Sequence, residues 1–341
     1  MRYIIFYLFL SILCFGCKKK EASTTPSYTG SWSNINSVNT YTMCLDGLNN
    51  LYIPYNSGFE KWDGNTWSII SGINSLNGGF NSMCSDSLGN IYAGGTIYDS
   101  DSIIYVAEWN GSTWNKLHFG NTKADKTLKV YSICTDPSNN LYAAIGMQSY
   151  LYFYVVKWNG NSWDELGTGV NALNANNLIT SICSDKSGNI YAAGEFSDNI
   201  GSYVAKWNGT TWIDLGDHNL YGGYEIDALC NDAFGNIYIS TAGGSGQSIV
   251  LKWNGTNWSK LFDASVTYAI CSDISGNVYA TFNAMAAVPQ ISNVDKWNGS
   301  ALSVLGGNNA LNANAWIKCI CADKLGNVYA SGDFGYLARY H

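Results

Sequence analysis

One repeating unit accounts for most of this chain. Its first half, Cys-x-Asp-x-x-(Gly or Asn)-Asn-(Ile, Leu or Val)-Tyr, occurs seven times and ends at Tyr52, Tyr92, Tyr142, Tyr191, Tyr238, Tyr279 and Tyr329. Its second half, Trp-(Asn or Asp)-Gly-x-x-Trp, begins at Trp62, Trp109, Trp158, Trp207 and Trp253, with a sixth copy at Trp297 in which Leu302 replaces the second tryptophan. The repeats recur roughly every 40 to 50 residues, which is typical of the four-stranded blade of a β-propeller.

Each half of the repeat contains a turn. In the first half the turn runs from Asp185 to Asn189, and Gly188 supplies the positive φ that ends a type I turn. Asn49 and Asn139 fill the glycine slot in two copies, as expected of the residue that best tolerates this conformation. In the second half, Asn208-Gly209 is a strong hairpin signal. We expect these two residues to form the loop and the two tryptophans beside it to lie diagonally on one face.

The two ends of the chain predict how many blades there are. The last residues, 336–341, align with a third strand that lacks a fourth, and residues 30–35 align with a fourth strand that lacks the first three. Together they complete a seventh blade and remove both free sheet edges. We therefore predict an all-β fold: a seven-bladed β-propeller with four antiparallel strands per blade, the last blade closed by the N-terminal strand. An open stack with frayed ends is the alternative.

The N-terminus resembles a bacterial lipoprotein signal. Arg2 precedes an apolar run over residues 3–16 that is too short to span a membrane, and Cys17 follows it. The match departs from the usual lipobox because Leu13 lies four residues before the cysteine and Phe15 is bulky. We expect residues 1–16 to be the signal peptide, 17–29 the lipidated Cys17 with a flexible tether, and 30–341 the propeller. An uncleaved signal anchor is the alternative.

Seven cysteines occupy the same slot of the repeat and an eighth, Cys319, lies two residues before the last of them. Equivalent slots on different blades are expected to be too far apart for disulfides. We predict eight free thiols that pack as small apolar side chains. The seven in-register cysteines are Cys44, Cys84, Cys134, Cys183, Cys230, Cys271 and Cys321.

The combined motifs Asp-x-x-Gly-Asn-(Ile or Val)-Tyr and Lys-Trp-Asn-Gly-x-x-Trp resemble the repeats of bacterial exported β-propellers, in the broad kelch and galactose-oxidase-like grouping. The resemblance covers residues 30–341 and implies the fold, because such repeats encode the scaffold. It does not carry copper chemistry with it. The chain has only His118, His218 and His341, and none of them recurs in register.

Loop lengths separate the two faces of the predicted ring. The A–B and C–D turns, which join the first to the second and the third to the fourth strand, have constant spacing. The B–C spacing varies from 10 residues (Tyr52 to Trp62) to 18 (Tyr279 to Trp297). Because loop variation on a rigid scaffold is where recognition usually occurs, we expect the ligand on the face of the B–C and D–A loops. The ligand-binding candidates there are Tyr98, Asp101, Tyr150, Glu195, His218, Tyr221 and Trp316.

No catalytic constellation stands out in the sequence. The seven aspartates of the first turn could suggest a metal or catalytic ring, but turn capping explains them better. Glu195, Asp198 and Asp333 could form an acid/base pair of the kind that glycosidases use. Neither a cofactor nor a metal is predicted. A net charge of −7 argues against nucleic-acid binding.

The sequence therefore favours a non-catalytic cell-envelope lipoprotein, monomeric, that binds a glycan or protein ligand through the variable loops. One alternative is a carbohydrate-active hydrolase or lyase with those carboxylates at the channel mouth. Another is a structural partner in outer-membrane assembly. Lys18, directly after the lipidated cysteine, resembles the sorting signal that some bacteria use for the outer membrane.

Overall fold

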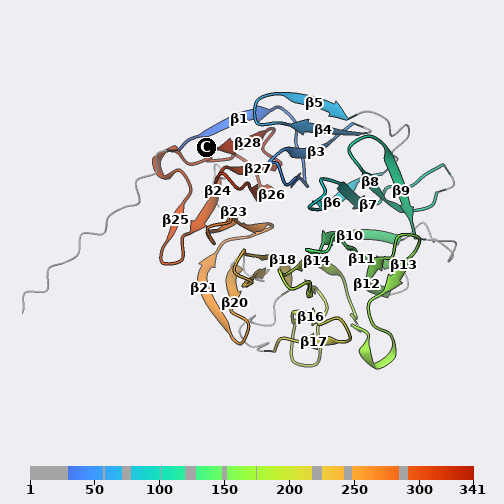
Figure 1. Cartoon of the computed structure of the whole chain (residues 1–341). Helices are drawn as coiled ribbons and strands as arrows, with labels where there is room; N and C mark the ends of the chain where they lie inside the picture. The colour runs from blue at the N-terminus through green and yellow to red at the C-terminus, as the bar shows by residue number, and fades with distance from the viewer. Residues whose placement is uncertain are drawn as a thin grey trace, which may run out of the picture.

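The fold is a ring of seven four-stranded antiparallel sheets around one axis, as the computed structural model shows (Figure 1). The structure describes residues 30–56, 58–70, 78–100, 102–119, 128–147, 152–173, 175–216, 225–241, 248–283 and 291–341. Each sheet is one blade, and its first strand is the one nearest the axis (Figure 1). The predicted seven-bladed β-propeller is confirmed.

The blades are numbered here in chain order. Blade 1 comprises β2 (Cys44–Leu45), β3 (Leu51–Tyr55), β4 (Gly58–Trp62) and β5 (Trp67–Ile70). Blade 2 comprises β6 (Phe80–Ser85), β7 (Ile91–Gly95), β8 (Tyr105–Trp109) and β9 (Trp114–His118). Blade 3 comprises β10 (Leu128–Thr135), β11 (Leu141–Met147), β12 (Tyr152–Trp158) and β13 (Trp163–Glu165). Blade 4 comprises β14 (Ile179–Ser184), β15 (Ile190–Gly194), β16 (Ala205–Trp207) and β17 (Trp212–Asp214).

The remaining blades complete the ring. Blade 5 comprises β18 (Ile226–Asn231), β19 (Ile237–Thr241), β20 (Ser248–Trp253) and β21 (Trp258–Ala264). Blade 6 comprises β22 (Ile270–Ser272), β23 (Val278–Asn283), β24 (Ser292–Trp297) and β25 (Leu302–Val304). Blade 7 comprises β26 (Ile317–Ala322), β27 (Val328–Gly332), β28 (Leu337–Tyr340) and β1 (Trp32–Asn36). Two short 3₁₀ turns, Gly169–Asn171 and Gly307–Asn309, follow blades 3 and 6.

The two ends of the described chain meet in blade 7. Strand β1 pairs with β28 in antiparallel register, with Trp32 opposite Tyr340. Just beyond the strands, Ser31 and His341 exchange two backbone hydrogen bonds of 3.1 and 3.2 Å. The N-terminal strand therefore covers the edge that the C-terminal strand would otherwise expose, as the sequence predicts.

The core is divided among the blade interfaces. Seven apolar clusters each combine residues of two adjacent blades, so that both faces of every sheet are buried. Between blades 3 and 4, for example, Cys134 and Tyr142 from one sheet pack with Ile182 and Ile190 from the next. This explains why the first two strands are apolar or small at nearly every position, instead of alternating with polar residues.

The turn between the first two strands repeats the same hydrogen bonds in every blade. In blade 4, Oδ1 of Asp185 accepts the backbone N–H groups of Ser187 and Asn189, at 2.8 and 3.0 Å. Oδ2 accepts the Asn189 side-chain amide at 2.7 Å and the Tyr191 hydroxyl at 3.0 Å. The predicted capping role is confirmed, and so is the positive φ of Asn49 (66°) and Asn139 (63°).

The predicted register of the second hairpin is wrong, because the centre of the loop lies one residue later than expected. Trp207 pairs directly with Trp212, and the ring centroids are 5.7 Å apart. Asn208 closes the turn instead of forming its centre, because its backbone N–H bonds to Thr211 and its Oδ1 accepts the N–H groups of Thr210 and Thr211. Gly209, with φ of 98°, is then the first central residue, which is the glycine position of a type II′ turn.

The cysteines behave as predicted. All eight in the described residues are free, and they are buried or half-buried. Among the same residues, no helix is long and apolar enough to cross a membrane.

Candidate functional site

A β-bulge in the innermost strand creates the site. In blades 2, 3, 4, 5 and 7 the pairing of the first strand with the second slips by one residue, five residues before the turn aspartate. The extra residue fits neither face of the sheet, and a bulge commonly re-aims such a side chain. We call this position the axial slot. It contains Tyr41, Asn81, Tyr131, Thr180, Asp227, Tyr268 and Lys318.

The axial slot differs from its neighbours in chemistry. The core positions two and three residues after the slot repeat from blade to blade as Ile, Leu or Met and as Cys, whereas the slot carries aromatic, neutral polar, acidic and basic side chains. These side chains are half-buried or exposed, and none belongs to an interface cluster. The slot lies near the B–C and D–A loops, since it is at the opposite end of the first strand from the A–B turn.

Lys318 is at the centre of a group of aromatic side chains. Its ammonium lies 3.6 Å from the ring centroid of Tyr268, in the neighbouring blade, and 4.4 Å from that of Trp316. The two rings are themselves 5.5 Å apart. Burial lowers the pKa of Lys318, while Asp333 and Asp227 act in the opposite direction. These contacts show that slot residues of adjacent blades meet near the axis.

Carboxylates surround this group. Burial and, after it, the negative charges of Glu225 and Glu195 raise the pKa of Asp227 to about 6, although the charge of Lys318 acts in the opposite direction. Burial and Glu225 also raise the pKa of Glu195, which Asn177 counteracts through a hydrogen bond. Like charges that crowd together favour the protonated form of each.

Two further tyrosines border the carboxylates. The Tyr41 hydroxyl donates a hydrogen bond to Asp333, which raises the pKa of that phenol. Burial, followed by the charge of Glu195, raises the pKa of Tyr131. We call the whole group the axial cluster. It comprises Tyr41, Tyr131, Glu195, Glu225, Asp227, Tyr268, Trp316, Lys318 and Asp333, from six of the seven blades.

The other two slot residues bond to backbone. The Asn81 side-chain amide donates to the carbonyl of Val130 at 3.0 Å, and the Thr180 hydroxyl donates to the carbonyl of Ile226 at 2.9 Å. Both acceptors belong to the next blade in the ring, so these residues join blades. The axial cluster is therefore asymmetric around the axis.

Three of the predicted site residues lie in the axial cluster. Glu195 and Asp333 directly follow the second strands of blades 4 and 7, and their backbone N–H groups bond to the carbonyls of Leu178 and Trp316. Trp316 directly precedes β26. Its indole Nε1 is buried and, within the described residues, has no hydrogen-bond partner.

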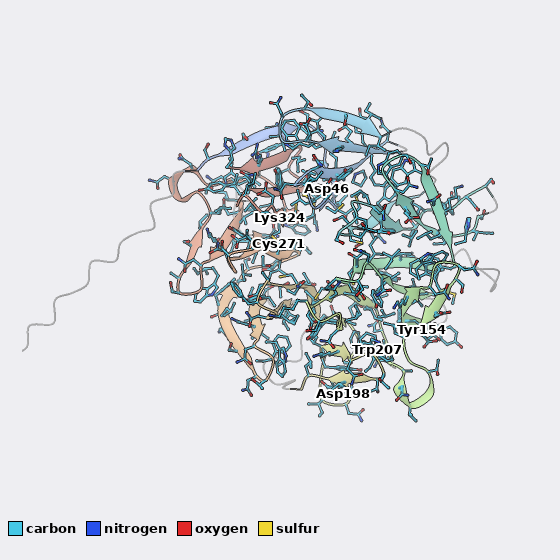
Figure 2. All side chains as sticks on the ribbon, viewed as in Figure 1. Asp46, Tyr154, Asp198, Trp207, Cys271 and Lys324 are labelled. Atoms are coloured by element: carbon cyan, nitrogen blue, oxygen red, sulfur yellow. The ribbon has the colours of Figure 1, made fainter. Side chains whose placement is uncertain are left out.

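Asp198 lies outside the axial cluster, and its pairing with Glu195 as acid and base stays a prediction. Its Oδ1 accepts the backbone N–H groups of Ile200 and Gly201 at 2.7 and 3.0 Å, so the carboxylate caps its own loop. The side chain is exposed and lies toward the outer part of blade 4, whereas Lys324 and Asp46 lie nearer the axis (Figure 2).

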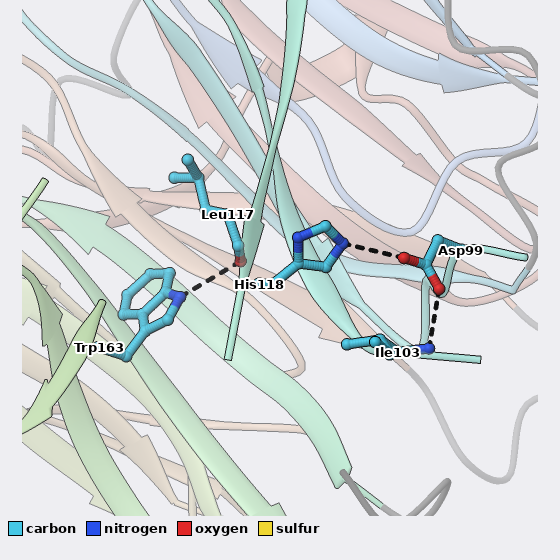
Figure 3. A network of polar contacts seen from close by, with 5 residues as sticks. All are labelled: Asp99, Ile103, Leu117, His118 and Trp163. Atoms are coloured by element: carbon cyan, nitrogen blue, oxygen red, sulfur yellow. Dashed lines mark hydrogen bonds and ion pairs between the residues drawn. The ribbon is translucent and has the colours of Figure 1, made fainter. Parts of the chain in front are cut away.

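Tyr98 is also separate from the axial cluster. It is exposed and bridges to Ile104 within its own loop. Figure 3 shows how that loop is fixed: Asp99 accepts the backbone N–H of Ile103 at 3.0 Å, and its other oxygen is 3.0 Å from Nε2 of His118. Since His118 is on β9, the outermost strand of blade 2, these contacts hold the loop away from the axis.

The other predicted positions lie outside the described residues. They are Asp101, Tyr150, His218 and Tyr221 among the ligand-binding candidates, and Cys17 with the signal peptide and tether. Within the described residues, no three His, Cys, Asp or Glu side chains are placed to hold a metal ion.

Sequence reasoning missed the axial slot itself, and with it Tyr41, Tyr131, Asp227, Tyr268 and Lys318. A signal was present: when the repeats are aligned on the turn aspartate, the position five residues earlier carries unlike side chains, whereas the residue after it is always small. Glu225 had no such signal, because it precedes the repeat.

A cavity of about 440 Å³ lies at the opposite end of the axis, among the A–B turns of blades 2 to 7. Its lining includes the turn aspartates, whose oxygens are already occupied by their own turns. Burial alone would raise the pKa of Asp185, but hydrogen bonds from Asn189, Ser187 and Tyr191 lower it overall. These carboxylates stabilise the fold. The axial cluster therefore has more polar side chains available to a ligand than the cavity at the A–B turns has.

The fold resembles several solved propellers. The extracellular domain of the hybrid two-component system BT3049 from B. thetaiotaomicron matches with a TM-score of 0.66 and 14% identity, over 91% of this chain and 41% of that one. YCF48 bound to D1 peptide matches with a TM-score of 0.61 and 13% identity, over 91% of this chain and 96% of that one. A catalytically inactive virginiamycin B lyase from Staphylococcus aureus, with quinupristin, matches with a TM-score of 0.65 and 6% identity, over 91% of this chain and 99% of that one.

These likenesses concern the fold alone. This chain spans about two fifths of the length of BT3049. No protein-family model matches the sequence. No curated protein matches it by sequence. The comparisons thus support the β-propeller fold.

Proposed function

We propose that this protein is a non-catalytic lipoprotein of the cell envelope that binds a peptide or glycan at the axial cluster. The observation that carries the proposal is the axial slot, where an otherwise uniform repeat places unlike side chains side by side. Aromatic faces next to carboxylates and an ammonium offer stacking and paired hydrogen bonds in one place. The loop face predicted from spacing is also the face that carries this cluster.

The charges of the axial cluster indicate which class of ligand would bind there. The axial cluster contains four carboxyl groups and one ammonium, so it offers mainly hydrogen-bond acceptors and negative charge. A peptide with basic side chains or a hydroxyl-rich sugar complements such a surface. Two resemblances support the choice: YCF48 was solved with a peptide, and other neighbours are extracellular domains.

Export and anchoring rest on the sequence. The apolar run over residues 3–16 and Cys17 support a lipid anchor, most simply at the outer membrane, with residues 18–29 as the tether. Radiolabelled palmitate should label the wild-type protein but not a Cys17→Ser variant. Equal labelling of both would contradict the anchor.

The ligand is tested by a thermal-shift screen of the protein against basic peptides, glycans and divalent ions, with calorimetry on each hit. Trp316→Ala and Asp227→Asn should weaken binding by at least about tenfold, since central aromatic and charged contacts dominate affinity. Asp198→Asn, on the same face but outside the axial cluster, is the matched control and should leave binding unchanged. Binding that survives both cluster variants would overturn the site.

Catalysis is the second candidate, and one observation favours it. A carboxyl group whose pKa is near 6, as burial makes it for Asp227, can donate and accept protons at neutral pH. The screen separates the two functions, because a hydrolase or lyase would consume its ligand and Asp227→Asn would stop the turnover. A pure binding protein returns the ligand unchanged.

A further inference from the structure

Large apolar side chains are exposed at the A–B turns, on the face opposite the axial cluster. Each turn presents two residues, directly after the aspartate, to solvent. Five of the seven turns place a large apolar side chain there. The exposed fractions are 84% for Leu48, 76% for Leu88, 63% for Phe234, 57% for Ile274 and 77% for Leu325. We call these five residues the apolar crown.

Turn geometry does not explain the crown. These turn positions favour polar residues, and Ser138, Ser187 and Ser275 occupy the second of them in blades 3, 4 and 6. A serine in three of seven equivalent turns shows that the fold does not need an apolar side chain there. Contiguous exposed apolar residues commonly mark an interaction surface.

The charge of these turn positions is distinctive as well. The two exposed positions of the seven turns carry no carboxylate and two lysines, Lys186 and Lys324, although the whole chain has a net charge of −7. The turn aspartates lie beneath these positions, buried and hydrogen-bonded within their own turns. The exposed tips of the turns therefore combine apolar side chains with two ammonium groups, which can contact the headgroups of a bilayer.

The crown is an uninterrupted arc. Phe234, Ile274, Leu325, Leu48 and Leu88 belong to blades 5, 6, 7, 1 and 2, which follow one another around the ring. The cavity of about 440 Å³ lies inside the circle of turns. Five neighbouring turns at one end of the ring can thus present their apolar side chains to the same surface.

The N-terminal segment joins the propeller on this same face. In a four-stranded antiparallel blade the A–B and C–D turns lie at one end. Blade 7 has no C–D turn; instead, Ser31 and His341 lie side by side at that position. The described part of the chain therefore begins at the end that carries the crown. The 13 steps from Cys17 to Gly30 can reach at most about 45 Å, enough for the face to approach a membrane that holds Cys17.

We propose that the apolar crown docks on the surface of a lipid bilayer, with Lys186 and Lys324 near the headgroups. The inference goes beyond ligand binding and rests on the lipid anchor of the proposed function. Docking would fix the orientation of the ring, with the axial cluster facing away from the membrane. Leucine and phenylalanine side chains at a membrane interface and lysines near anionic headgroups are the contacts that hold peripheral proteins on bilayers.

The experiment separates docking from anchoring. The acylated full-length protein, with a specific protease site in residues 21–29, is reconstituted in vesicles of phosphatidylethanolamine and phosphatidylglycerol. The tether is then cut, and the propeller that remains on the vesicles is measured by flotation. The wild-type propeller should stay bound. The triple variant Leu48→Ser, Leu88→Ser and Leu325→Ser should be retained at least about fivefold less.

A matched control removes apolar side chains from the other face. Val170, Ile200 and Ile291 are exposed on the B–C and D–A side, and replacing all three by serine should leave retention at the wild-type level. Unfolding temperatures should agree among all three proteins, because serine already occupies the crown slot in other blades. Equal release of wild type and crown variant after cleavage would overturn docking while leaving the anchor intact.

Two other outcomes are diagnostic. If the crown variant floats free of vesicles before the tether is cut, the anchor itself has failed, which contradicts the proposed lipoprotein and not the docking step. If the wild-type protein sediments without vesicles as a dimer that the crown variant abolishes, the crown binds a second copy of this chain. That result would overturn the lipid assignment.

Discussion

At the scale of single residues, the turn aspartate is the most heavily used side chain of the repeat. In blade 4 it accepts four hydrogen bonds, two on each oxygen, from three residues that follow it within the same turn and strand. Its seven copies recur in the sequence, and most of them line the cavity near the axis, so together they could be mistaken for a functional ring. The hydrogen bonds show that the turn aspartate is structural.

Asp185→Ala should therefore destabilise the fold strongly. Two backbone N–H groups, an amide and a phenol lose their acceptor, which corresponds to a loss of about 2–4 kcal/mol of unfolding free energy. Chemical denaturation measures it. Asp198→Ala, in an exposed loop of the same blade, should cost less than about 1 kcal/mol. Equal losses in the two variants would contradict the structural role of the turn aspartate.

Asp295 is a buried carboxyl at a position where five of the other six blades have an apolar residue. It is 8% exposed and pairs on β24 with Ala280 of β23, which belongs to the apolar cluster between blades 5 and 6. Equivalent positions hold Ala205 and Ala338. In blade 1 the equivalent Glu60 accepts a hydrogen bond of 2.9 Å from the Asn36 side chain.

Burial raises the pKa of Asp295 to about 6, and this predicts a pH dependence. The folded state holds the proton more tightly than the unfolded chain, so stability falls as the pH rises from about 4 to 6. Asp295→Ala should thus raise the unfolding free energy at pH 7, by on the order of 1–3 kcal/mol, with a smaller gain at pH 4. Denaturation at both pH values measures the difference. A loss of stability at pH 7 would contradict the assignment.

At this scale the sequence predicts well what local chemistry decides. The turn aspartates, the positive φ of Asn49 and the free cysteines all follow from repetition and spacing. The pairing of Glu195 with Asp198 stays a prediction. The sequence did not indicate that Asp198 caps backbone N–H groups of its own loop.

At the scale of elements, side chains of the outer and inner strands join several blades to the one before. The indole N–H of Trp67 donates to the carbonyl of Ile35 at 2.8 Å, and that of Trp212 donates to Leu166 at 2.7 Å. At the inner strands, the Thr135 hydroxyl donates to the carbonyl of Ser85 at 2.7 Å. The second tryptophan of the repeat thus links blades, besides packing on the first.

Trp67→Phe tests this link at the point of ring closure, because Ile35 lies on β1. The aromatic packing is largely kept and one hydrogen bond is lost, so the unfolding free energy should fall by about 1 kcal/mol. The matched control is Trp62→Phe in the same blade, since the Nε1 of Trp62 is buried without a partner in the described residues. An equal or larger loss from the control would contradict the role of the hydrogen bond.

The elements also show where sequence reasoning fails. The Asn-Gly pair correctly predicts a tight hairpin, but the loop centre lies one residue later, because the Asn208 side chain closes the turn. The bulges were not predicted. A bulge shifts the alternation of side chains by one residue, and a strand buried on both faces has no regular alternation in which that shift would be noticed.

At the scale of the whole molecule, the ring joins two surfaces with different chemistry. One end carries the axial cluster and loops of varied length, and the other carries uniform turns, the apolar crown and the start of the chain. Blade number, closure and the identity of the variable face could be predicted from the sequence. The placement of unlike side chains from six blades around one axis could not, because it depends on the closed ring.

Ring closure predicts cooperative protection of the thiols. The eight cysteines of the described chain are buried or half-buried, and burial raises the pKa of each of them. Without denaturant, a thiol reagent should modify none of these eight rapidly, and in denaturant without reductant all eight should react. Blade-by-blade modification at intermediate denaturant would contradict cooperative closure.

The most direct test of the central claim compares the two ends of the axis in one calorimetric experiment. The ligand found by screening is titrated into the wild-type protein, into Trp316→Ala, and into the crown variant with Leu48, Leu88 and Leu325 replaced by serine. Binding at the axial cluster predicts a dissociation constant at least about tenfold higher for Trp316→Ala and unchanged for the crown variant. The reverse pattern, with affinity lost in the crown variant and kept in Trp316→Ala, would place the ligand at the opposite face and contradict the account.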